Sequence, residues 1–153
     1  MRRAILSTVL SLSVLSLAGC GRDDAPKVKT GTDANGTQSV TVTDNKGTEV
    51  TIAGAGGSAN MPAFAPLFPG ATVESSVTTP QKGGMVAFKT SSSPQDVIDF
   101  YKKSAADAGM KDNVNMTSGD AINYSASSQT PSHNLTVTAS KSEDFTQVQV
   151  IWN

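Results

Sequence analysis

Apolar residues recur at every second position in four stretches of the chain, which is typical of half-buried β-strands. These stretches contain Val86 and Phe88; Ile122, Tyr124 and Ala126; Leu135, Val137 and Ala139; and Val148, Val150 and Trp152. Polar side chains such as Asn123, Ser125, Thr136, Thr138, Gln147 and Gln149 occupy the alternate positions. The pattern predicts an antiparallel sheet with one apolar face and one solvated face.

A helical period replaces this alternation in SPQDVIDFYKKSAADAG, residues 93–109. Ser93 can cap a helix, Pro94 fits its first position and Gly109 can end it. Its apolar or small residues fall on one face: Val97, Ile98, Phe100, Tyr101, Ser104, Ala105 and Ala108. We therefore predict one amphipathic helix packed on one face of the sheet.

The preceding segment, residues 39–52, also alternates and carries turn residues at Asp44 to Gly47, which predicts a β-hairpin. This hairpin either extends the main sheet or packs on it. Residues 53–60 are rich in glycine and predict a flexible linker. They do not resemble a phosphate-binding loop, because Pro62 and Pro66 follow where such a loop needs the start of a helix.

Residues 61–153 are predicted to form the compact domain. Three prolines separate Phe64, Leu67 and Phe68 near its start, and we expect these side chains to cover one edge of the core. Residues 20–38 contain a single large apolar residue, Val28, and predict a disordered tether. The expected fold class is thus α+β, with four to six antiparallel strands, one helix, an N-terminal hairpin and a tether.

The first nineteen residues have the three parts of a secretory signal. Arg2 and Arg3 precede an apolar stretch, residues 4–17, and small residues follow before Cys20. The apolar stretch is shorter than the roughly 20 residues that a membrane-spanning helix needs. The sequence Leu17-Ala18-Gly19-Cys20 resembles the bacterial lipobox, in which signal peptidase II cleaves before a lipidated cysteine. We predict a signal peptide, residues 1–19, and lipid on Cys20.

Two further motifs, LFPGATV (67–73) and VIDFYKKSAADAGM (97–110), resemble those of small exported bacterial lipoproteins of uncharacterised function. The resemblance covers residues 61–153 and brings no catalytic residues with it. It implies a protein of the bacterial cell envelope, held in the membrane by lipid on Cys20. By the sorting rule of enteric bacteria, Gly21 after the cysteine implies the outer membrane, facing the periplasm.

Charge and candidate chemistry exclude several functions. Removing residues 1–19 takes away two of the 12 basic residues and none of the 13 acidic ones, leaving a net charge of −3, which disfavours nucleic acid as a partner. The single cysteine cannot form a disulfide within the chain. His133 is the only histidine, so it is either a turn residue or an isolated ligand or base, and no cofactor or metal site is expected.

We expect a periplasmic binding or assembly module and not an enzyme. Its candidate binding face contains Thr136, Thr138, Gln147 and Gln149, beside Met85 and Ile151, and would contact another envelope protein or a glycan. That face is otherwise merely solvated or covered by the hairpin, in which case an exposed edge strand is the better candidate. A hydrolase without a recognisable motif and a purely structural lipoprotein are the alternatives.

Overall fold

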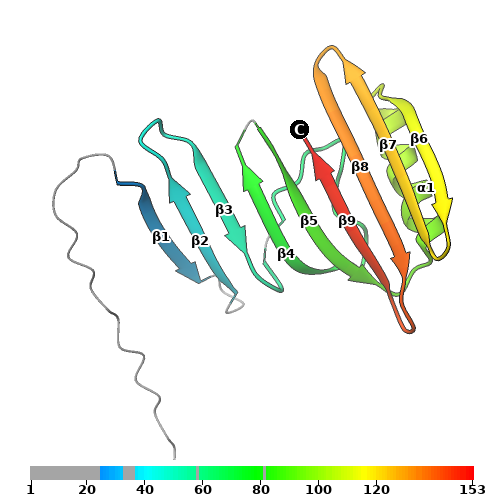
Figure 1. Ribbon diagram of the computed structural model, residues 1–153, viewed down its shortest axis with the longest axis horizontal. Coiled ribbons are helices and arrows are strands. Elements are labelled where there is room, and N and C mark those ends of the chain that lie inside the picture. Colours follow the sequence, from blue (N-terminus) through cyan, green and yellow to red (C-terminus); the bar gives the residue numbers. More distant parts are fainter. Residues whose placement is uncertain (1–24, 33–36, 58, 81) are drawn as a thin grey trace, which may run out of the picture.

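The computed structural model describes residues 25–32, 37–57, 59–80 and 82–153. The signal segment and Cys20 lie outside them. Nine strands form one open antiparallel sheet in the order β1-β2-β3-β4-β5-β9-β8-β7-β6 (Figure 1). The strands are β1 (Lys27–Thr32), β2 (Gln38–Thr43), β3 (Glu49–Ala53), β4 (Thr72–Thr79), β5 (Gly83–Thr90), β6 (Lys111–Ser118), β7 (Ala121–Gln129), β8 (Ser132–Lys141) and β9 (Thr146–Trp152).

The helix α1 (Pro94–Asp107) connects β5, in the middle of the sheet, to β6 at its far edge. It therefore crosses one face of the sheet and packs on β7 and β8, behind the strands in Figure 1. Ser93 accepts a hydrogen bond from the backbone N–H of Asp96, and the Asp96 carboxylate accepts one from the backbone N–H of Ser93. This capping box begins the helix as the sequence predicts.

The core lies between α1 and the sheet. The predicted strand residues meet across neighbouring strands, with Val150 paired to both Val86 and Val137, and Leu135 paired to Trp152. Val97, Ile98, Tyr101 and Ala105 of the helix are buried against them, which confirms most of the predicted helix face. Ala108, predicted on that face, is exposed because it is the C-cap residue at the end of the helix.

The helix covers only half of the apolar face, and the segment between β3 and β4 covers part of the rest. Ala65 is fully buried there, while Phe64, Leu67 and Phe68 pack against the core, as predicted. The Phe68 ring stacks on Phe88, with ring centroids 6.5 Å apart, and meets the edge of Phe100 at 5.1 Å. The core side of the sheet is thus covered by the helix over β7 and β8 and by the proline-containing loop over part of β4, β5 and β9.

Two expectations about the sheet need correction. It has nine strands and not four to six, because the hairpin β2–β3 joins the main sheet through β4 and two further strands lie at its edges. Residues 27–32, predicted to belong to a disordered tether, form β1, in which Val28 pairs with Val42. β6 is exposed throughout. Both edge strands are held by backbone pairing and not by burial, which explains why a search for buried apolar residues misses them.

Candidate functional site

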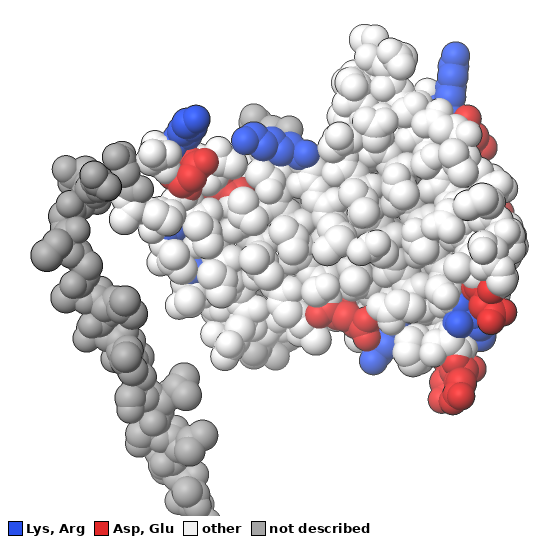
Figure 2. Space-filling view, in the orientation of Figure 1, with Lys and Arg blue, Asp and Glu red and all other residues white. Residues whose placement is uncertain are grey.

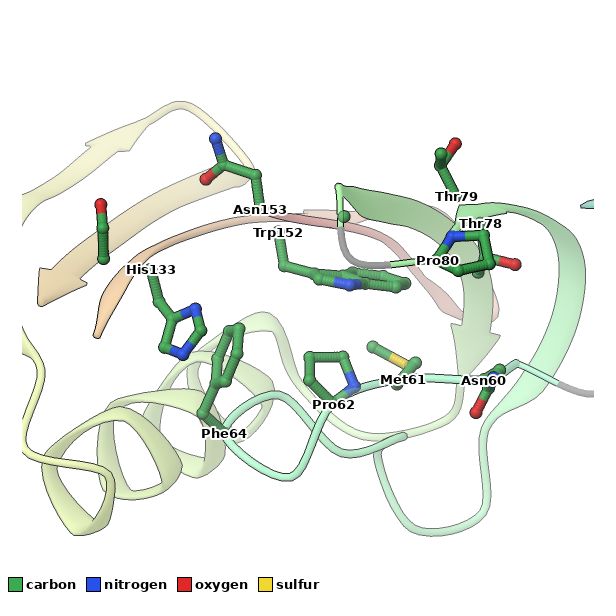
Figure 3. A pocket seen from close by; sticks show the side chains of 12 residues that line it. Asn60, Met61, Pro62, Phe64, Thr78, Thr79, Pro80, His133, Trp152 and Asn153 are labelled. Carbon is green, nitrogen blue, oxygen red and sulfur yellow. The ribbon is translucent and has the colours of Figure 1, made fainter. Parts of the chain in front are cut away.

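A pocket of about 400 Å³ opens at the end of the sheet where β8 begins and β9 ends. The loop between β3 and β4 forms one wall with Met61, Pro62 and Phe64. The sheet forms the other, and the indole of Trp152 lies opposite Met61 and Pro62 (Figure 3). The pocket therefore exists because the loop crosses the sheet without filling the space at its end.

Two glycines at the start of β5 position the tryptophan. A Cβ atom on Gly84 would lie 2.6 Å from Cζ2 of Trp152 and 2.7 Å from the carbonyl oxygen of Val77. A Cβ atom on Gly83 would lie 2.1 Å from the carbonyl oxygen of Trp152, and Gly83 also has φ +113°. No larger residue fits without a shift, so the Gly83-Gly84 pair lets the indole lie flat against β5.

His133 and Phe64 form the side of the pocket next to the helix. Their rings stack with centroids 4.6 Å apart and an interplanar angle of 25° (Figure 3). Both residues also line a second hollow of about 430 Å³, whose other wall includes Ser104 and Ala108 of the helix end. The stacked pair consequently separates two adjacent hollows.

The lining of the first pocket is apolar with neutral polar groups at intervals. Met61, Pro62, Phe64, Pro80 and Trp152 supply the apolar surface. The polar groups are those of Asn60, Thr78, Thr79, Ser132, His133 and Asn153. None of the described lining residues is an acid, a lysine or an arginine, so this surface suits an uncharged ligand with a large apolar part.

The structure places the four predicted face residues together, on the side of the sheet that the helix leaves open. Thr138 pairs with Gln149, and Thr136 and Gln147 lie on the same face two residues away along their strands. Several are already bonded within the chain: Thr138 Oγ1 donates to Asn123 Oδ1 at 2.8 Å, and Gln147 Nε2 donates to Glu74 Oε2 at 2.5 Å. Gln149 Nε2 lies 3.0 Å from Met85 Sδ.

The hairpin does not cover these residues, because it lies beside β4 in the same sheet. The described residues contain no group of three His, Cys, Asp or Glu side chains that could hold a metal ion. Within the same part of the chain, no helix has the length and apolar character needed to cross a bilayer.

The sequence indicates Trp152 and Phe64 only as core and covering residues, and it gives no sign of the pocket. The walls of the pocket come from five separate segments, from Asn60 to Asn153. The nearest local signal is the Gly83-Gly84 pair, which becomes informative only once β5 is known to pair with the tryptophan end of β9.

Comparison with known protein families finds one similarity. A family model described as START domain-like matches residues 72–147, just under half of the chain. The match begins with β4, includes α1 and ends in β9, so β1–β3 and the loop containing Met61 and Phe64 lie outside it. No curated protein and no solved structure matches the chain.

Proposed function

We propose that the protein is a ligand-binding module of the bacterial cell envelope, anchored by lipid on Cys20, which binds an uncharged, largely apolar molecule beside Trp152. The pocket carries the binding part of this proposal. Its volume of about 400 Å³ falls within the range of small-molecule sites, roughly 300 to 1,000 Å³. The similarity to START domain-like proteins over residues 72–147 supports a binding role.

The pocket's chemistry sets the class of ligand. The Trp152 indole and the Phe64 ring offer flat apolar surfaces, which favour contact with a planar or aliphatic molecule. Thr78, Ser132 and His133 can form hydrogen bonds at its edge. A charged ligand would lose its hydration without gaining an ion pair from any described lining residue, so it should bind more weakly.

An enzyme remains the less favoured function. Among the described lining residues, His133 is the one candidate for a general base, and its ring stacks on Phe64. Ser132 precedes it in the chain, but no hydrogen bond recorded in the structure links them or orients the histidine toward a nucleophile. Binding needs only the shape and polarity described above.

The binding part is tested with a neutral fluorescent probe, N-phenyl-1-naphthylamine. The protein for this test is the chain from residue 20 onward with Cys20→Ala, which retains every described residue. We expect the probe's emission to rise and the fluorescence of Trp152, the only tryptophan, to fall. Anilinonaphthalene sulfonate, a related probe with an anionic group, should bind more weakly.

Two variants of β4 provide the matched comparison. Thr78→Phe places a ring in the pocket wall, whereas Thr72→Phe places the same ring at the other end of the strand. Thr78→Phe should weaken binding of the neutral probe by about tenfold or more, and Thr72→Phe should not. Equal affinity in both variants would place the probe elsewhere and reject the pocket as the site.

The anchor is tested separately by fractionating cells. The expected diacylglycerol on Cys20 and acylated amino group would hold the protein firmly in the membrane, because a second acyl chain makes attachment stable. Wild-type protein should therefore sediment with outer membranes, and Cys20→Ala should become soluble or remain unprocessed. A Cys20→Ala variant that is processed and still sediments as firmly as wild type would contradict lipidation.

A further inference from the structure

In the strands β2 and β3, the aliphatic side chains lie on the face of the sheet opposite the core. In β5, β9, β8 and β7 the buried apolar residues lie on the face of the sheet that carries α1. In β2 and β3 the polar residues Ser39, Thr41 and Thr51 lie on that side, while Val40, Val42, Val50 and Ile52 lie on the helix-free face. The register fixes this inversion, because Ala53 pairs with the buried Ser76 and its neighbour Ile52 must point the other way.

These side chains form one continuous row across five strands. Val40 pairs with Ile52, Ile52 with Val77, Val77 with Met85, and Met85 with Ile151. We call these five residues the aliphatic row. Ile52 is 48% exposed and Ile151 is 43% exposed. Val40 is 36% exposed, and Val77 and Met85 are half-buried. The five side chains form one contiguous apolar strip, unlike apolar residues that are exposed singly.

The surface around the row carries very little charge. Figure 2 shows this face, on which lysine and acidic side chains lie around the rim and leave the centre uncharged. The two edges of the sheet look different: β1 carries Lys27 and Lys29, and β6 has a register shift between Asp112 and Val114. Charged side chains and bulges hinder pairing at sheet edges, so association through the face is favoured over association through an edge.

We propose that the aliphatic row is the centre of a homodimer interface, in which two copies pack their helix-free faces together. The row residues are mainly β-branched, and such side chains interdigitate well between two pleated sheets. The helix-free face of the five strands that carry the row is about 24 Å wide at about 4.8 Å per strand, and about 23 Å long for strands of about seven residues, with the row across its middle. Each copy thus offers about 550 Å², or about 1,100 Å² in total, which meets the ~1,000 Å² expected of a specific interface.

Other occupants fit less well. In the chain from residue 20 onward, the residues outside the described ranges, 21–24, 33–36, 58 and 81, contain no large apolar side chain that could cover the row. A bilayer surface is ordinarily contacted through tryptophan or tyrosine and through lysine or arginine, and the row contains none of these. A second copy needs only the uncharged aliphatic surface that the protein has, and one two-fold axis would place each row against its equivalent.

The test is sedimentation velocity over a wide range of concentration, using the chain from residue 20 onward with Cys20→Ala. We expect a reversible dimer. Ile52→Lys should raise its dissociation constant by about 100-fold, because a charge would be buried without a partner. Val114→Lys is the matched control: Val114 is also 48% exposed and on the same face, but lies in β6 away from the row. The Val114→Lys variant should leave the dimer intact.

Far-UV circular dichroism and thermal melting of both lysine variants show whether each is folded. If Ile52→Lys does not fold, Val77→Cys replaces it, because Val77 is the middle residue of the row and should form a disulfide with its equivalent, whereas Val114→Cys should not. A wild-type monomer at every concentration would overturn the proposal, as would equal effects of the two lysines. Monomeric wild type that binds neutral phosphatidylcholine vesicles through Ile52 would assign the row to a bilayer instead. None of these outcomes depends on the pocket or on lipid at Cys20.

Discussion

At the scale of single residues, both tyrosines of the chain are structural. Burial raises the pKa of Tyr101, opposed only by the backbone of Phe68, and its hydroxyl makes no hydrogen bond within normal distance. Burial also raises the pKa of Tyr124, and a hydrogen bond of 2.6 Å to the Asp112 carboxylate, together with its charge, adds to the effect. Each shift means that the folded protein favours the neutral phenol over the phenolate.

This difference predicts how stability depends on alkaline pH. A raised folded-state pKa contributes stability that is complete below the unfolded value of about 10 and is lost as the pH rises above it. Ultraviolet absorbance of tyrosinate should therefore show no ionisation near pH 10 while the protein is folded, and ionisation should coincide with loss of the circular dichroism signal. A tyrosine that titrates normally in folded protein would show that its hydroxyl reaches solvent.

The close contact between Gly84 and Trp152 can be tested with a variant. Gly84→Ala would force the Trp152 indole or the Val77 carbonyl to move, and overpacking of this kind costs about 1 to 3 kcal/mol of unfolding free energy. Urea unfolding should detect this loss, and Trp152 emission should shift to longer wavelength. Gly54→Ala is the control, because its Cβ atom would meet only the Gln38 carbonyl oxygen at 3.9 Å. Similar losses in both variants would mean that the indole does not depend on Gly84.

At the scale of elements, the sequence predicts the helix and the strands that bury one face, and it misses the two exposed edge strands. The helix and β5, β7, β8 and β9 follow from their apolar spacing, since each buries one face in the core. β1 and β6 bury almost nothing, so their sequences lack that spacing. The hairpin β2–β3 is predicted from its alternation and turn, but joining β4 through three residue pairs is a long-range contact that its own sequence does not specify.

The capping box gives the clearest prediction for an element. Ser93→Ala removes the side chain that accepts from the Asp96 backbone N–H and donates to its carboxylate at 2.7 Å. We expect a loss of about 1 kcal/mol in unfolding free energy, measured by urea denaturation. Ser91→Ala, in the exposed turn two residues earlier, should change it little. A null result at Ser93 would show that packing of Val97 and Ile98 alone sets the start of the helix.

At the scale of the whole molecule, the candidate site arises because the helix and the proline-containing loop together leave part of one sheet face uncovered. The helix covers β7 and β8, the proline-containing loop covers part of β4, β5 and β9, and the pocket lies where the loop meets the end of β9. Such a site depends on how distant segments meet, which is why the sequence predicts the apolar character of Trp152 and Phe64 but not the pocket between them. The predicted face of Thr136, Thr138, Gln147 and Gln149 could be placed from alternation alone, since it requires only the strand period.

The most direct test of ligand binding beside Trp152 is a ¹H–¹⁵N nuclear magnetic resonance titration with N-phenyl-1-naphthylamine. The chain has one tryptophan, so a single indole Nε1–H peak reports on the pocket. We expect this peak to move together with the backbone peaks of Met61, Phe64 and Thr78, while those of Thr136 and Gln149 on the opposite face stay in place. An unmoved indole peak accompanied by shifts at Thr136 and Gln149 would contradict the pocket and return binding to the helix-free face.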